Sequence, residues 1–259
     1  MSGPALLVTG ATGALGGAVA ARLAAEGRDV LLTGRNEARL KELAEGLREA
    51  GAGPGALETV AADAATEDGA RTAVRAALDR FGALHGLVHL IGGFAVGPVM
   101  RTGAQEHRDL YHANVVSAVE ATRAVLPHLG EGGRLVYVSS LLAAEPFPAM
   151  GAYAASKAAL QAWVRSLAHE VKDRGVRANT VVMTMADTPE ARASRPGVDF
   201  DMATRPEEVA EVIAFLTGAG AEGVNGAAVP VLGRFAFSTP MLGGSPGGGP
   251  PGGPPGGHG

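Results

Sequence analysis

Residues 6–17 read LLVTGATGALGG, an apolar run that leads into a loop with glycines at positions 10, 13 and 16. An Ala-rich segment with helical spacing follows and extends to Glu26. Glycine lets the chain turn sharply and approach a ligand closely, and a helix N-terminus offers free N–H groups and a partial positive charge. The stretch therefore predicts a strand–loop–helix unit that binds the phosphates of a nucleotide. Because glycine accounts for 39 of the 259 residues, an ordinary structural turn is the alternative interpretation.

The same alternation continues along the chain. Short apolar runs rich in Val and Leu occur at 5–8, 29–33, 56–61, 84–91, 134–140, 176–183 and 227–232. Stretches with helical spacing separate them, at 14–26, 36–50, 66–81, 104–129, 152–173 and 206–217. This pattern predicts an α/β fold, a Rossmann-type doubly wound parallel sheet of about seven strands flanked by helices. We expect a single domain over residues 1–234.

The composition excludes several functional classes. Hydrophobic residues make up 46% of the chain, which supports a large core. The net charge of −4 indicates no basic surface, so we expect no nucleic acid partner. Cysteine is absent, and His85 and His89 lie in a predicted strand, where their spacing does not converge on one ion. We therefore expect no metal site.

The two ends of the chain carry further expectations. The N-terminus has no basic region followed by a signal-type apolar core, and no run approaches membrane-spanning length. We therefore expect a cytoplasmic protein without a membrane partner. Residues 235–259 form the expected C-terminal tail, which from residue 243 contains only glycine and proline apart from one serine and one histidine. Such a composition cannot offset the entropy of ordering, so we expect disorder from residue 243.

The end of the second predicted strand, VLLTGRNEARL, bears on the type of nucleotide. An acidic residue at this place usually holds a ribose 2′-hydroxyl, whereas an arginine accommodates a 2′-phosphate. No carboxylate occurs between Val30 and Asn36, and Arg35 stands in the relevant position. The sequence therefore favours NADP(H) as cofactor, with NAD(H) possible. A solvated arginine that precedes the next helix is the alternative interpretation of Arg35.

Tyr153 and Lys157, in GAYAASKAAL, are four residues apart and share one face of a predicted helix. A lysine beside a phenol favours its ionised form and lowers its pKa towards the range of an acid–base catalyst. Ser140 ends the predicted strand RLVYVSS, at the sheet edge where ligands bind in this architecture. Its hydroxyl is placed to donate to a substrate oxygen, whereas Ser139 is expected to bond to nearby backbone.

With these motifs in this order, residues 4–234 resemble the short-chain dehydrogenase/reductase (SDR) family. The matching features are Thr9 with the glycine loop, the serine at 140 and the YxxxK at 153–157. The resemblance implies four catalytic residues: Asn114, Ser140, Tyr153 and Lys157. It implies that the cofactor contacts Gly10, Thr12, Gly13, Leu15, Gly16, Arg35, Asp63, Ala64, Gly92, Tyr153, Lys157 and Thr188. Without the resemblance, Asn114 is a polar break in an apolar helix.

Three features depart from the family's pattern. The loop reads TGxxGxxG, with alanine at 14 and glycine at 13, where short members usually have TGxxxGxG. The NNAG segment after the fourth strand is replaced by HLIGG at 89–93, in which only the glycine survives. The PG after the sixth strand is replaced by Met183 and Thr184. These departures concern the loops that shape the nicotinamide and substrate pocket.

The sequence as a whole predicts an NADP-dependent oxidoreductase that interconverts a carbonyl compound and a secondary alcohol. The alternative is a nucleotide-binding regulatory or scaffold protein of the same fold with little turnover, which the altered loops would suit. The resemblance also implies a homotetramer or homodimer formed through residues 104–129 and 152–173. Alanines at 154, 155, 158 and 159 would allow close helix approach, unless they pack on the sheet.

Overall fold

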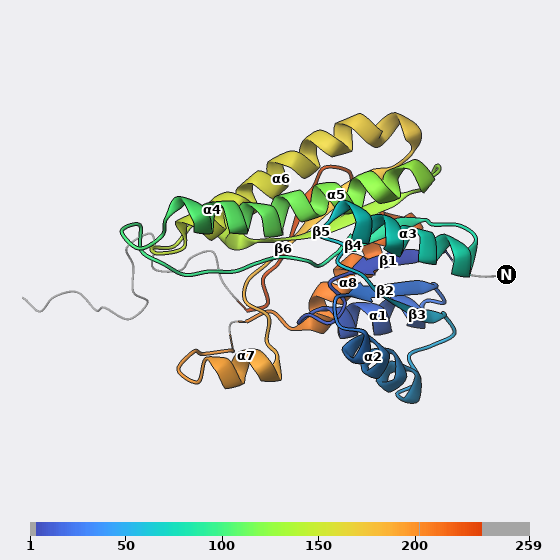
Figure 1. The fold of residues 1–259 in the computed structure, drawn as a ribbon, viewed down its shortest axis with the longest axis horizontal. Coiled ribbons are helices and arrows are strands. Elements are labelled where there is room, and N and C mark those ends of the chain that lie inside the picture. Colours follow the sequence, from blue (N-terminus) through green and yellow to red (C-terminus); the bar gives the residue numbers. More distant parts are fainter. Residues whose placement is uncertain (1–3, 202, 235–259) are drawn as a thin grey trace, which may run out of the picture.

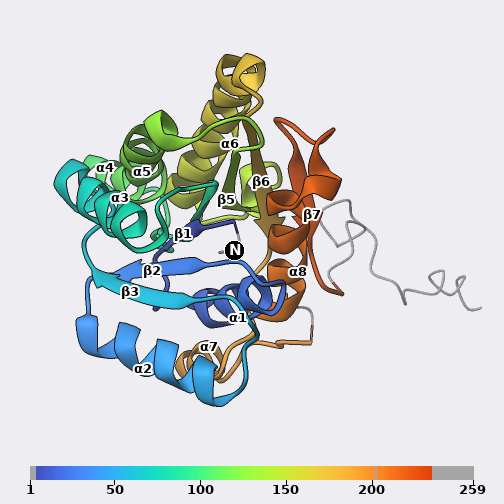
Figure 2. The same cartoon turned by 90° about the vertical axis from the view of Figure 1, so that its right-hand side faces the viewer.

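The computed structural model of the protein describes residues 4–201 and 203–234. Seven parallel strands form one sheet in the order β3-β2-β1-β4-β5-β6-β7, and helices cover both of its faces (Figures 1 and 2). The strands are β1 (Leu6–Thr9), β2 (Val30–Gly34), β3 (Leu57–Ala61), β4 (Gly86–His89), β5 (Arg134–Ser140), β6 (Arg177–Met183) and β7 (Ala228–Val231). The predicted fold class, a doubly wound parallel sheet within one domain, is confirmed.

Burial on both faces of the sheet explains why the central strands are apolar throughout. In β1, Leu6 and Val8 pack in one hydrophobic cluster, whereas Leu7 packs in the other. Successive side chains of a strand point to opposite faces, so a doubly covered strand has no solvent-facing positions. The first cluster includes residues of α1 (Gly16–Ala25), α2 (Glu37–Glu49) and α8 (Pro206–Thr217). The second includes residues of α3 (Glu67–Phe81), α5 (Ser117–Val125) and α6 (Gly151–Val171).

The order of the strands determines where a ligand can bind. β1 pairs with β2 on one side and with β4 on the other. Strands β2 and β3 therefore extend the sheet on one side of β1, and β4 to β7 extend it on the other. The loops after β1 and β4 therefore leave the same edge of the sheet in opposite directions and create a crevice. The glycine loop at residues 10–16 lies at this point.

The predicted helix over residues 104–129 is interrupted in the structure. It consists of α4 (Ala104–Tyr111), a π-helical turn (His112–Val116), α5 and a short 3-10 turn (Leu126–His128). Helix α7 (Pro189–Ser194) lies between the predicted strand at 176–183 and the predicted helix at 206–217 and was not predicted from the sequence. Further 3-10 turns lie at Leu141–Ala143, Lys172–Arg174 and Ala219–Ala221. The predicted tail at 235–259 lies outside the described residues.

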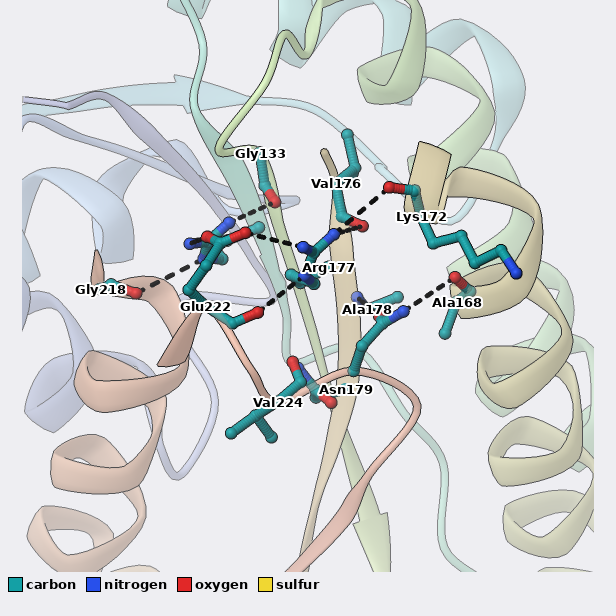
Figure 3. A network of polar contacts seen from close by, with 12 residues as sticks. Gly133, Ala168, Lys172, Val176, Arg177, Ala178, Asn179, Gly218, Glu222 and Val224 are labelled. Carbon is teal, nitrogen blue, oxygen red and sulfur yellow. Dashed lines mark hydrogen bonds and ion pairs between the residues drawn. The ribbon is translucent and has the colours of Figure 1, made fainter. Parts of the chain in front are cut away.

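A network of polar contacts joins the N-terminal ends of β5 and β6 to the segment after α8 (Figure 3). Arg134 and Arg177 donate to the two carboxylate oxygens of Glu222, at 2.6 and 2.7 Å. Nearby, the Asn179 side chain donates to the carbonyl of Val224 at 2.8 Å. These contacts lie at the opposite end of the strands from the glycine loop, so they anchor the sheet without entering the candidate site. Within the described ranges, no helix combines the length and apolarity needed to cross a bilayer.

Candidate active site

A cavity of about 830 Å³ lies at the carboxyl ends of the strands. Its lining includes part of the glycine loop, the segment after β4, and the predicted residues Ser140, Tyr153 and Lys157. The remaining wall comes from the segment between β5 and α6 and from the segment that follows β6. The fold therefore brings the predicted phosphate loop and the predicted acid–base residues to one cavity.

Close packing explains the glycines of the loop. Gly10 has a φ of +69°, and a Cβ there would lie 2.9 Å from the backbone nitrogen of Ile91. A Cβ at Gly16 would lie 1.8 Å from the carbonyl oxygen of Ala11, and one at Gly13 would lie 3.2 Å from that of Gly10. At Gly10 and Gly16 the neighbouring backbone therefore leaves no room for a side chain. Gly13 lies in a tight turn where a Cβ would be crowded.

This loop fits the phosphates of a dinucleotide. Leu15 precedes the first residue of α1, and no side chain of the described residues caps this helix N-terminus. Gly10, Gly13 and Leu15 also line the cavity. Uncapped N–H groups at a helix N-terminus, beside a backbone without side chains, are the arrangement in which phosphate is held.

Lys157 is buried at the base of the cavity. Its Nζ donates to the carbonyl of Val138 at 3.0 Å and lies 6.0 Å from the centre of the Tyr153 ring. Burial lowers the pKa of Lys157 to about 8, because a low-dielectric environment disfavours the charged form. Its position on α6, one turn from Tyr153, is the one that the YxxxK spacing predicts.

The pKa of Tyr153 differs from the sequence-based expectation. Burial raises this pKa, and the side-chain interaction with Ser140 acts in the opposite direction with less effect. Lys157 is not among the groups that shift this pKa, so the lowering expected from Lys157 is not seen in the structure. The ammonium group is directed to the carbonyl of Val138 instead. The phenol is therefore protonated at neutral pH and able to act as an acid.

The two serines at the end of β5 have different environments. Ser140 lines the cavity, and its Oγ accepts a hydrogen bond from the backbone N–H of Leu142 at 3.2 Å. Ser139 donates to the carbonyl of Lys157 at 3.4 Å and accepts from Gln161 at 2.9 Å. Because their side chains point to opposite faces of the sheet, only Ser140 is available to a ligand, which supports the choice of Ser140 over Ser139.

Asn114 lies in the π-helical turn and is fully buried. Its amide oxygen accepts from the backbone N–H of Gly93, and its amide nitrogen donates to the carbonyl of Gly93, both at 3.0 Å. The nitrogen also donates to Ser156 Oγ at 3.0 Å. Asn114 does not line the cavity itself, and it binds the segment after β4 to the helix that carries Tyr153 and Lys157.

The surviving glycine of the HLIGG segment has a steric explanation. A Cβ at Gly92 would lie 2.7 Å from Asn114 Oδ1 and 3.2 Å from Lys157 Nζ. Any side chain at this position would displace at least one of these two groups. Gly92 therefore allows the lysine and the asparagine to approach the same point of the backbone.

His89 replaces the first asparagine of the family's NNAG segment and bridges two elements. Its Nδ1 lies 2.9 Å from Thr9 Oγ1, and its Nε2 lies 3.2 Å from Ser117 Oγ. The side chain is buried, and burial, followed by the charge of Lys157, lowers its pKa to about 3. The neutral imidazole therefore connects β1 to α5 beneath the cavity. From the sequence, His89 was considered only as a metal ligand, and its bridging role was not predicted although the departure from NNAG marked the position.

The predicted adenosine-side residues lie along the same edge of the sheet but do not line the cavity. Gly34 of β2 pairs in register with Ala61 of β3, so Arg35 and Asp63 leave neighbouring strands. Both of these side chains are exposed. A Cβ at Gly34 would lie 3.4 Å from Thr12 Oγ1, which brings Thr12 to the end of β2.

Two other predicted cofactor residues are buried. Ala64 packs at the end of β3 with 1% exposure. Thr188 caps α7, because its Oγ accepts from the N–H of Ala191 at 3.1 Å.

The altered loop after β6 is held by a hydrogen bond of 2.7 Å between the hydroxyl groups of Thr184 and Thr204. Met183 and Thr184, the departures from the family's PG, both line the cavity.

Phe94 and Arg195 are among the cavity residues that were not predicted from the sequence. The Phe94 ring meets the Tyr153 ring edge-on, with 4.9 Å between the ring centres. The Arg195 guanidinium carbon lies 5.2 Å from the centre of the Phe94 ring. Phe94 follows HLIGG and Arg195 follows α7, so their contact joins segments that are far apart in sequence. No local pattern indicates such a contact.

Comparisons with known proteins agree with this fold. A model of the short chain dehydrogenase family matches residues 4–199. An uncharacterised oxidoreductase of Methylorubrum extorquens is 30% identical, covering 90% of this chain and 98% of the relative. The 2-(R)-hydroxypropyl-CoM dehydrogenase of Xanthobacter autotrophicus is 31% identical, covering 88% and 97%. A short chain dehydrogenase of Burkholderia cenocepacia, solved in complex with NADP, is 32% identical with a TM-score of 0.78, covering 90% and 97%. The chain therefore belongs to the short-chain dehydrogenase/reductase family of oxidoreductases.

Proposed function

We propose that the protein is an NADP(H)-dependent oxidoreductase that interconverts a small-molecule carbonyl compound and a secondary alcohol. The observation that carries this proposal is the shared cavity, in which Ser140, Tyr153 and Lys157 lie beside the glycine loop. The Tyr153 phenol can act as a proton donor there. The Ser140 hydroxyl and the buried Lys157 ammonium group lie close enough to orient it.

In the proposed reduction, the Tyr153 phenol donates its proton to the carbonyl oxygen. Burial supports this role because it raises the pKa of Tyr153 and keeps the proton on the phenol at neutral pH. Ser140 holds the same oxygen by donating a hydrogen bond. When bound, the nicotinamide supplies the hydride for the carbonyl carbon. In the reverse direction the phenolate accepts the proton of the alcohol.

Lys157 and Asn114 are proposed to support the proton donor. Lys157 lies one helical turn from Tyr153, and its pKa near 8 lets it hold or release a proton close to neutral pH. Asn114 fixes the backbone beside Lys157 through its paired bonds to Gly93. By family resemblance, Asn114 also positions a water molecule in a proton relay to the lysine.

The cofactor is proposed to lie along the carboxyl edge of the sheet. The glycine loop would hold the phosphates, Asp63 and Ala64 would contact the adenine end, and Thr188 would contact the carboxamide. Arg35, exposed at the end of β2, would bind a 2′-phosphate. The binding of NADP by the Burkholderia relative supports this preference. NAD(H) is the alternative cofactor.

The catalytic proposal is tested with the variant Tyr153→Phe in an assay of NADPH oxidation against a panel of ketones. Loss of the proton donor should reduce kcat by about a hundredfold or more. The matched control is Tyr111→Phe, because Tyr111 is exposed on α4 and does not line the cavity. Equal rates for Tyr153→Phe and the unmodified protein would contradict the proposed mechanism.

The cofactor proposal is tested with Arg35→Ser. Loss of a charge-assisted contact to the 2′-phosphate should lower kcat/KM for NADPH by about tenfold and leave that for NADH nearly unchanged. Arg71→Ser, at an exposed arginine of α3, serves as the control. A fall of equal size for both cofactors would indicate that Arg35 does not recognise the phosphate.

A further inference from the structure

The cavity beyond the proton donor is mainly apolar. Its wall there includes Leu141, Leu142, Phe147, Met150, Met183 and Met185. Phe94 continues this apolar surface from the ring of Tyr153. Such a wall favours a substrate with a hydrocarbon segment next to the reacting carbonyl, because burial of apolar area stabilises the complex.

Arg195 is a cation within this apolar surface. Its guanidinium stacks over the Phe94 ring, and one of its N–H groups faces Met185 Sδ at 2.8 Å. Sulfur is only a weak hydrogen-bond acceptor, so this contact leaves the donors of the guanidinium poorly satisfied. The side chain is half-buried and lines the cavity.

No carboxylate forms an ion pair with Arg195 in the part of the chain that the structure describes. The remaining residues, 1–3, 202 and 235–259, contain no aspartate or glutamate. Asp199 also lines the cavity, but its carboxylate accepts from the backbone N–H of Asp201 at 2.9 Å. Among the described residues, Arg195 therefore has no carboxylate partner.

The neighbouring arginine of the same segment shows the contrast. Arg192 forms two bonds to the carboxylate of Asp187, at 2.6 and 2.8 Å. This hydrogen bond, followed by weaker effects that include the charges of Asp201 and Asp199, raises the pKa of Arg192. Asp187 is thus paired with Arg192, whereas Arg195 faces the cavity without such a pair among the described residues.

We propose that Arg195 binds an anionic group of the substrate, a carboxylate or a sulfonate. The substrate class would then be carbonyl compounds in which an apolar segment separates the reacting carbonyl from an acidic group. In the proposed binding mode, the substrate extends from its carbonyl group at Tyr153, along the Phe94 ring, to its acidic group at the Arg195 guanidinium. Stacking holds the planar guanidinium in one orientation, so its paired donors are directed before the anion arrives. This inference rests on the proposed carbonyl chemistry at Tyr153.

The inference is tested by comparing oxo acids with their methyl esters, which have the same carbonyl and apolar segment without the charge. The probes are 4-oxopentanoate, 5-oxohexanoate and 7-oxooctanoate. For at least one length, kcat/KM of the acid should exceed that of the ester by about tenfold or more, as a charge-assisted bidentate contact implies. In Arg195→Met this ratio should fall to about one, and Arg195→Lys should restore it only in part.

Arg192→Met is the matched control, because it removes an arginine from the same segment without removing a cation that faces the cavity. The ratio of acid to ester should be unchanged in this variant. An equal loss of acid and ester activity in Arg195→Met, with a raised KM for NADPH, would overturn the inference, because Arg195 would then bind the cofactor. An unmodified protein that does not prefer the acid would overturn it as well.

A binding measurement separates this inference from the proposed function. Titration of the NADPH-loaded protein with each acid, followed by NADPH fluorescence, should give a Kd that rises about tenfold in Arg195→Met. Binding of acids that depends on Arg195 but leads to no oxidation of NADPH would support the anion site and contradict the proposed reaction. Reduction of esters without binding of acids would support the reaction and overturn the anion site.

Discussion

The absence of a side chain is decisive at Gly92, where the backbone comes close to both Asn114 and Lys157. In Gly92→Ala the added methyl group would displace the asparagine oxygen, the lysine nitrogen or both. A displacement of this size at a catalytic group can reduce turnover by about a hundredfold. We therefore expect kcat for carbonyl reduction to fall strongly while circular dichroism shows a folded protein. Gly103→Ala, where an added Cβ meets open space, should leave kcat unchanged.

The buried ammonium group of Lys157 predicts a pH dependence. Its pKa is lowered to about 8 by burial, so the free enzyme loses this charge as the pH rises through about 8. If the charge supports cofactor binding and proton donation, kcat/KM for reduction should be constant below that pH and fall above it, because kcat/KM reports ionisation in the free enzyme. A pH–rate profile that stays flat to pH 9.5 would contradict this role.

His89 predicts a loss of stability in acid. Its pKa is about 3 in the folded chain, whereas an unperturbed histidine has a pKa near 6.5. The unfolded chain therefore binds a proton that the folded chain excludes, and stability falls as the pH decreases from about 6.5 towards the folded pKa. Urea unfolding between pH 7 and 4 should show this loss in the unmodified protein. The loss should be smaller in His89→Gln and unchanged in the exposed control His107→Gln.

At the scale of elements, periodicity was enough to predict six helices and all seven strands within a few residues. It did not predict the π-helical turn at Asn114, because apolar spacing indicates where a helix lies and does not show how its backbone hydrogen bonds are spaced. The short α7 was missed although Thr188, followed by Pro189, is a recognisable helix start. For the site, the spacing of Tyr153 and Lys157 was sufficient, since both lie on one helix. The contacts of Phe94 and Arg195 could not be predicted, because they depend on how separate segments meet.

Glu222 connects two strands and predicts how the far end of the sheet responds to pH. Arg134, foremost, and Arg177 lower the pKa of this carboxylate by hydrogen bonding and charge (Figure 3). A carboxylate with a lowered folded pKa contributes stability above its unfolded pKa and loses it as the pH falls through the folded value. Glu222→Gln should therefore lower Tm at pH 7 and have little effect at pH 3. Glu49→Gln, on the exposed side of α2, should change Tm at neither pH.

At the scale of the whole molecule, two segments extend past the carboxyl edge of the sheet, one after β4 and one that contains α7 (Figure 1). The stacking of Phe94 and Arg195 joins them over the cavity. The buried residues of both core clusters lie outside these segments, and only the partly buried Leu90 and Ala186 of the segments pack against the first cluster. Substitutions in the two segments should therefore alter substrate choice more than folding. Substitutions in the network around Glu222 should alter folding more than substrate choice.

The outer surface of α6 bears on assembly. Ala154 is buried and Ala158 and Ala159 are partly buried, which supports their packing within the chain, whereas Ala155 and Ala162 are exposed. We propose that the protein forms a homodimer or homotetramer through α4, α5 and α6. Small residues on one helix face let a second copy approach closely, and a two-fold axis would bring the same face of each copy together.

This assembly predicts a mass of two or four chains of 26.0 kDa in light scattering of the unmodified protein. Ala162→Arg places a long charged side chain on the proposed contact in both copies, so each two-fold interface would contain two like charges without partners. We expect this variant to shift to smaller species, with a mass that depends on protein concentration. Ala38→Arg, on the exposed surface of α2, should leave the mass unchanged because that helix lies on the other face of the sheet. A single-chain mass for the unmodified protein at assay concentration would contradict the proposed assembly, and a shift in both variants would place the interface elsewhere.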